Sequence, residues 1–192
     1  MIEPRRNAFI HDVALSAGLP VSIAHAIAAE LAAPHRHYHG LGHHALMLRQ
    51  LGGTRAELLA CLYHDLVYDP KAKDNEVQSA ALAQRDLACL APDLVPIVTQ
   101  LILATRGHEP TGDVLIDRFL RADLWILVAP DRIYDWYARG VRKEYGFVPD
   151  ATYAVARKAV LGSLADACGS LFTEEEQAQM RRNLARESAK LG

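Results

Sequence analysis

Hydrophobic and polar residues alternate with the period of an α-helix along almost the whole chain, and no two segments show the pattern of paired strands. Short connections, many with proline or glycine, separate the helical segments. Helices are predicted near residues 4–17, 21–33, 55–68, 74–90, 93–105, 113–129, 131–145 and 150–168, and from residues 43 and 173 onward. The pattern therefore predicts one all-α domain, a bundle of eight to ten helices.

Three helix starts carry capping signals. Thr54 with Glu57, and Thr173 with Glu176, have the spacing of a capping box, in which each residue satisfies a backbone N–H of the first turn. Asp113 precedes an apolar periodic segment and is a predicted N-cap.

Composition and charge narrow the functional classes. The chain has 192 residues, which suffices for one domain with a sizeable core, and a net charge of -2, which gives no basic field for a nucleic-acid polymer or an anionic membrane. Its three cysteines are far apart, which argues against a disulfide framework. With no uninterrupted apolar segment at the N-terminus and none of membrane-spanning length, we expect a cytoplasmic protein.

Two aspartates fall where core residues are expected. Asp123 lies on an apolar helical stripe formed by Ile116, Leu120, Leu124 and Leu127. Asp65, next to His64, lies on a second stripe formed by Leu58, Cys61, Leu62 and Tyr68. An ionised carboxylate in an apolar interior costs several kcal/mol unless a partner neutralises it.

Histidines supply candidate partners for these carboxylates. Five of the nine histidines lie in "APHRHYHGLGHH", at positions 35, 37, 39, 43 and 44. A divalent cation bound by two carboxylates and two imidazoles would satisfy all four groups. The alternative is that both aspartates are partly exposed or paired with arginine.

Three segments that contain these residues resemble the HD superfamily of metal-dependent phosphohydrolases. "YHGLGHHALM", "LLACLYHDLVYDP" and "FLRADLWIL" follow the family order of histidine, His-Asp and aspartate. "DNEVQSAALA", "LILATRGHE", "RKEYGFVPD" and "RRNLARES" are similar to a bacterial branch of predicted HD phosphohydrolases. The resemblance implies one HD-type domain over residues 1–192, with a motif core at about 36–145 and C-terminal helices 150–189 packed on it.

The resemblance also implies the metal ligands, which are His43, His64, Asp65 and Asp123. "YHGLGHHA" is similar to a segment of cyclic-nucleotide phosphodiesterases in which the second histidine binds metal and the first protonates the leaving oxygen. That similarity selects His43 over His44 as the ligand and makes His39 the candidate general acid. We expect His35 and His37 to be exposed to solvent. The alternative is that either of them contacts a substrate phosphate.

The chain departs from the family pattern at two positions. Gly40 stands where such segments usually have asparagine, which bears on the placement of His39. Arg121 stands where the bacterial branch often has a second aspartate. Because Arg121 is two residues from Asp123 on a helix, its side chain is expected to point away from that carboxylate.

The expected chemistry needs one divalent metal ion, for which Mn, Fe, Co, Ni, Mg and Zn are all candidates. Such an ion lowers the pKa of a bound water and polarises a phosphoryl oxygen. Asp65 is the first candidate to orient or deprotonate that water, and Asp69 and Glu76 are alternatives. Glu76 equally fits an acidic residue that stabilises a helix N-terminus.

Further residues are candidates for substrate contacts. A guanidinium binds phosphate in bidentate fashion, so Arg36 and Arg142 are possible phosphate ligands, with salt bridges as the alternative. His108 could reach a second metal or the phosphate, or cap its own helix. Arg182, Asn183 and Glu187 are expected to tie the last helix to the core.

The sequence thus predicts a metal-dependent phosphohydrolase for a phosphomonoester or a nucleotide. A phosphodiesterase or cyclic-nucleotide hydrolase is the alternative enzyme, and a non-catalytic HD module that binds a nucleotide is the alternative without catalysis. The expected partner is a small phosphorylated substrate. The oligomeric state is open, with a homodimer as one option.

Overall fold

Residues 3–192 are described by a computed structural model, so the first two residues of the segment searched for a signal peptide lie outside the described residues. The described residues form ten α-helices and three short 3-10 helices, without a β-strand, which confirms the all-α prediction. None of these helices has both the length and the apolar character needed to cross a membrane. The chain divides into two compact units, Met1–Arg106 and Gly107–Gly192.

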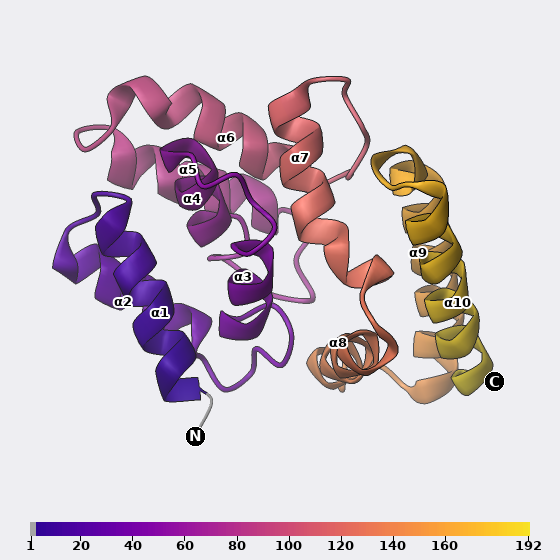
Figure 1. Cartoon of the computed structure of the whole chain (residues 1–192). Coiled ribbons are helices and arrows are strands. Elements are labelled where there is room, and N and C mark those ends of the chain that lie inside the picture. The colour runs from indigo at the N-terminus through magenta and orange to yellow at the C-terminus, as the bar shows by residue number, and fades with distance from the viewer. Residues whose placement is uncertain (1–2) are drawn as a thin grey trace. The chain divides into compact units, whose positions relative to one another are not determined.

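In the first unit, helix α4 (Arg55–Tyr63) is surrounded by other helices. The elements of this unit are α1 (Glu3–Ser16), α2 (Val21–Leu31), α3 (Leu41–Met47), α4, α5 (Asn75–Leu87), η1 (Pro92–Leu94) and α6 (Val95–Ala104). Helix α4 packs on α1, α3, α5 and α6, and α1 lies beside α2 (Figure 1). Leu59 to Tyr63 of α4 are completely buried, so this helix forms the centre of the unit.

Helix α4 begins where the sequence predicts but ends earlier. The capping box is confirmed: the Glu57 N–H donates to Thr54 Oγ1 at 3.3 Å, and the Thr54 N–H donates to Glu57 Oε2 at 3.0 Å. The prediction that the helix runs to residue 68 is wrong, because the residues after Tyr63 form a turn. There the guanidinium of Arg36, in place of helical N–H groups, donates to the carbonyls of Asp65 and Leu66.

The second unit consists of α7 (Val114–Asp123), η2 (Leu124–Val128), α8 (Asp131–Glu144), α9 (Asp150–Cys168), η3 (Gly169–Leu171) and α10 (Glu174–Lys190). Helix α10 packs on α8, α9 and η2 (Figure 1). The carboxylate of Asp113 accepts from the N–H groups of Leu115 and Ile116, which confirms the predicted N-cap. The continuous helix predicted for 113–129 is wrong: α7 ends at Asp123 and the chain tightens into η2.

The apolar stripe of α7 and η2 is confirmed, since Ile116, Leu120, Leu124 and Leu127 are all buried. Two of the three residues expected to tie α10 to the core do so. Asn183 Nδ2 donates to the carbonyls of Leu127 and Ala129, and Glu187 accepts from Arg157 and Tyr134. The third expectation is wrong, because Arg182 is exposed and bonds to Gln179 of its own helix.

Candidate metal centre

His64 follows directly after α4 and is held in one ring orientation. Its side chain is buried, and its Nδ1 lies 2.9 Å from the carbonyl oxygen of Cys61. A carbonyl only accepts, so Nδ1 carries the proton and donates it. In the neutral ring Nε2 then carries the lone pair, and this is the form of histidine that binds metal ions.

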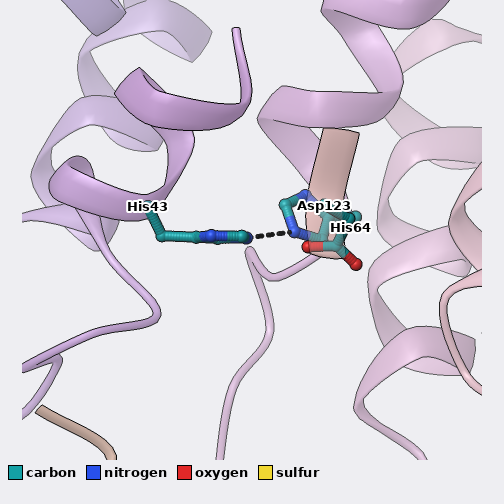
Figure 2. Close-up of side chains that lie close together, drawn as sticks. All are labelled: His43, His64 and Asp123. Carbon is teal, nitrogen blue, oxygen red and sulfur yellow. Dashed lines mark hydrogen bonds between the residues drawn. The ribbon is translucent and has the colours of Figure 1, made fainter. Parts of the chain in front are cut away.

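His43, on α3, points its ring toward His64 (Figure 2). It is also buried, and its Nε2 lies 3.0 Å from the Nε2 of His64. Two imidazole nitrogens at this distance either share a proton or both point their lone pairs at a cation. The pair therefore supplies two nitrogen donors from helices that pack on each other in one unit.

Asp65 adds a carboxylate to the two imidazoles. Its Oδ2 lies 3.2 Å from His64 Nε2 and 3.6 Å from His43 Nε2. The residue lies in the turn after α4 and not on the helix, so the stripe that predicted its inward position does not extend that far. Its side chain is nevertheless only 17% exposed and faces histidines instead of an arginine. Burial raises the pKa of Asp65, but the rings of His64, His39 and His43 outweigh it and hold this pKa far below its usual range.

Asp123, the second carboxylate predicted from the sequence, lies at the end of α7 in the second unit. In the first unit, His43 and His64 each offer one nitrogen ligand atom for a metal ion (Figure 2). The Asp123 side chain is 10% exposed, and its Oδ2 lies 2.9 Å from His108 Nε2. His108 has a positive φ of 54°, which is uncommon for a residue other than glycine. At this distance of 2.9 Å, His108 directly contacts the carboxylate of Asp123, a predicted metal ligand.

The sequence leaves two positions open for His44, next to the ligands or at the surface, and the structure shows the first. His44 is completely buried, with its ring 4.9 Å from the ring of His64. Its Nδ1 donates to the carbonyl of Gly40 at 3.0 Å, and within the described residues its Nε2 has no hydrogen-bond partner. Burial, followed by the neighbouring His64 and His43, holds the pKa of His44 well below its usual value, so this ring is neutral.

Gly40 is required by close packing at this position. A Cβ atom there would lie 2.6 Å from the carbonyl oxygen of Leu31 and 3.1 Å from the Cβ of Arg36. Any larger side chain here, asparagine included, would collide with backbone, because the end of α2 closely approaches the loop that carries His39.

Arg36 holds this loop against the turn after α4. Its guanidinium donates to the carbonyls of His39 at 3.0 Å, Asp65 at 2.6 Å and Leu66 at 2.7 Å, and to the carboxylate of Glu30 at 2.9 Å. Its side chain is buried, so these donors are not free for a substrate. The predicted role as a phosphate ligand gains no support from these contacts, which instead make Arg36 a backbone clamp.

His39, the candidate general acid, lies near the two histidines without joining the ligand group. Its ring stacks on Tyr68 at 4.4 Å between centroids and lies 6.1 Å from the ring of His43. It is half-buried, which leaves it open to solvent on one side. Tyr68 also lines a cavity of about 780 Å³ beside the turn, together with side chains of α2 and α5. The candidate acid thus contacts a residue that lines this cavity.

The other candidates lie outside the group of His43, His64 and Asp65, although His35 and Asp69 line the cavity beside Tyr68. Arg142 donates to the carbonyls of Tyr145 and Val148 and pairs with Asp150, which is the salt-bridge alternative. Arg121 pairs with Glu176, so it is engaged away from Asp123 as expected. Glu76 lies in the first turn of α5, and Asp69 is an exposed loop residue. His35 and His37 are exposed.

Sequence reasoning missed three features of the centre. The burial of His44 depends on which face of α3 points into the unit. The pattern of residues around Gly40 and Gly42 does not predict that face. The clamp by Arg36 joins residues far apart in sequence, and no local pattern marks it. The stacking of Tyr68 on His39 could have been suspected, because both flank the candidate ligands in the motif segments.

Comparisons with protein-family models, with curated proteins and with solved structures found no match.

Proposed function

We propose that this chain is a metal-dependent phosphohydrolase that acts on a phosphomonoester or a nucleotide. The observation that carries the proposal is the pair of imidazole Nε2 atoms 3.0 Å apart, with the Asp65 carboxylate beside both. A buried group of this kind is costly without a cation. The HD-like order of the motifs supports phosphoester hydrolysis as its use.

The proposed ligands of one divalent ion are His43, His64, Asp65 and Asp123. Imidazole and carboxylate ligands suit Mn, Fe, Co, Ni, Mg or Zn. The fit rests on the tautomer of His64, whose Nδ1 is fixed by the Cys61 carbonyl. When bound, the ion would lower the pKa of a water and polarise a phosphoryl oxygen.

Residues of the chain would orient the water and protonate the leaving oxygen. Asp65, with a pKa held far below its usual range, is ionised at neutral pH and can orient the attacking water through a hydrogen bond. A carboxylate with so low a pKa is a weak base, so the water would lose its proton to the solvent, helped by the lowered pKa that a bound ion gives it. As water adds to phosphorus, the bond from phosphorus to the leaving oxygen breaks. His39 would donate a proton to that oxygen, and the cavity lined by Tyr68 would receive the alcohol part of the substrate.

Phosphate release tests the proposal. Purified chain should release phosphate from 4-nitrophenyl phosphate or a nucleotide panel when Mn, Co, Ni or Mg is added, and a chelator should stop the reaction. His64→Ala should be inactive, whereas His37→Ala, a matched change of an exposed histidine, should keep full activity.

Two results would contradict the proposal. The same activity in His64→Ala and the wild type would place the reaction elsewhere. Tight binding of a nucleotide without turnover, across a broad panel of phosphoesters and metals, would favour the non-catalytic binding module.

A further inference from the structure

A second hollow in the first unit has a different chemistry from the cavity beside the metal centre. It has a volume of about 680 Å³ and lies between α1 and α3. Its lining includes Arg5, Arg6, Phe9, Gly42, Leu46 and Arg49. We call it the arginine groove.

Among the described residues, the charges that line the arginine groove are of one sign. Three of these lining residues carry a guanidinium group and none carries a carboxylate, although the chain has 23 acidic and 21 basic residues. The cavity beside the metal centre, in contrast, is lined by Glu30, Asp69 and Asp86. Like charges gathered around one hollow repel each other, and an anion between them removes that repulsion.

Arg5 and Arg49 are available for such an anion. Both are exposed, and within the described residues neither side chain forms an ion pair or a hydrogen bond. Most other arginines of the chain are engaged: Arg85, Arg121, Arg157 and Arg186, for example, each pair with a carboxylate. A guanidinium without an acidic partner is well suited to a phosphate, which it binds through two parallel hydrogen bonds.

The remaining wall of the groove is apolar. Phe9 is 41% exposed, which is high for an aromatic side chain, and Leu46 is half-buried. An aromatic ring beside guanidinium groups can stack on a planar ligand. The groove therefore fits a molecule that has both a phosphate and an aromatic or apolar group.

The groove is separate from the metal centre. Gly42, Ala45 and Leu46 share one face of α3, and Arg49, in the turn after the helix, continues their spacing. His43, His44 and Met47 lie on another face of the same helix and are buried. A ligand in the groove would not meet the candidate metal ligands.

We propose that the arginine groove is a binding site for a small organic phosphate with an aromatic or apolar group, distinct from the site of hydrolysis. Arg5 and Arg49 bind the phosphate, and Phe9 contacts the apolar group. Binding does not need a metal ion, so the proposal does not rest on the proposed hydrolase activity.

The test uses 1-naphthyl phosphate as the probe and full-length chain kept metal-free with a chelator. Calorimetry should show saturable binding that weakens with salt, while the uncharged 1-naphthol should bind far more weakly. Arg49→Gln and Arg5→Gln should each weaken binding about tenfold or more, because each removes a charge-assisted hydrogen bond. Arg132→Gln changes an exposed arginine of the other unit and should have no effect.

The outcomes that overturn the proposal are distinct from a failure of the hydrolase. No binding at millimolar probe, or equal weakening by Arg132→Gln, would exclude a specific site. Loss of binding in His64→Ala, with Arg5→Gln and Arg49→Gln unchanged, would place the probe at the metal centre. Arg5 and Arg49 are both exposed, so their replacement leaves the fold intact and the comparison valid.

Discussion

At the scale of single residues, the environment divides the clustered histidines into different roles. His35 and His37 are exposed, His43 is buried beside His64, and His44 is buried with no hydrogen-bond partner for its Nε2 in the part of the chain that the structure describes. The sequence could predict that the His-Asp pair and an upstream histidine lie together, because their motif order resembles a known family. It could not predict the burial of His44, which depends on the packing of α3 around Gly40.

His39 is the residue whose proposed role has the sharpest kinetic signature. His39→Ala should slow the hydrolysis of an alkyl phosphate by roughly 10²–10⁴-fold, because the alkoxide leaving group needs a proton. It should spare 4-nitrophenyl phosphate, whose leaving group needs little protonation. Steady-state kinetics on both substrates, with metal content measured alongside, checks this prediction.

Two other results would assign His39 differently. An equal loss of rate on both substrates would make His39 a binding or structural residue. A loss of metal would make it a ligand and would reopen the assignment of His43.

At the scale of elements, helix starts could be predicted better than helix ends. The capping residues Thr54, Asp113 and Thr173 lie next to the helices that they begin, so a local pattern predicts each start. The end of α4 depends on a hydrogen-bond donor that is distant in sequence. Helix α7 ends where the chain changes from an α-helix to a 3-10 helix. At α4 the deciding partner is Arg36, which is distant in sequence from the carbonyls of Asp65 and Leu66.

The clamp role of Arg36 can be separated from the phosphate role that the sequence suggested. Arg36→Lys keeps the charge but loses the fork of donors that holds three carbonyls. Leaving buried carbonyls without donors should lower the free energy of unfolding by about 2–4 kcal/mol. Urea denaturation of substrate-free protein measures this loss. Unchanged stability with a raised KM would restore the phosphate role.

The start of α10 predicts a pH dependence. Burial raises the pKa of Glu176, but the Thr173 backbone N–H and the Arg121 guanidinium outweigh it and lower this pKa below its usual value. A carboxyl with a lowered pKa in the folded state stabilises the fold above its unfolded pKa of about 4.3, and this contribution is lost as the pH falls through the folded pKa.

Glu176→Gln should therefore lower the free energy of unfolding by about 0.5–1 kcal/mol at pH 7. The difference from the wild type should shrink as the pH falls below about 4. Glu175→Gln, in the same turn but exposed, is the control and should show a smaller effect at both pH values. A Glu176→Gln difference that stays constant with pH would show that the charge of Glu176 does not matter.

At the scale of the whole molecule, the helical period of the sequence predicted the all-α class, which the structure confirms. The division into two compact units follows from contacts between residues distant in sequence, which a local pattern does not predict. The division falls between Arg106 and Gly107, in a short connection that composition does not mark as a linker. The prediction of one HD-type domain over residues 1–192 stays a prediction, and so does the substrate. Within the first unit, the candidate metal centre brings together His43 of α3 with His64 and Asp65, which follow α4.

Elemental analysis of purified protein tests the central claim, that these residues bind a metal, most directly. The wild type should contain about one divalent metal ion per chain when no chelator has been used. His43→Asn and His64→Asn should lose it. His44→Asn should keep it, because asparagine can still donate to the Gly40 carbonyl and His44 is outside the ligand group. A metal-free wild type, or full occupancy in His43→Asn and His64→Asn, would contradict the account.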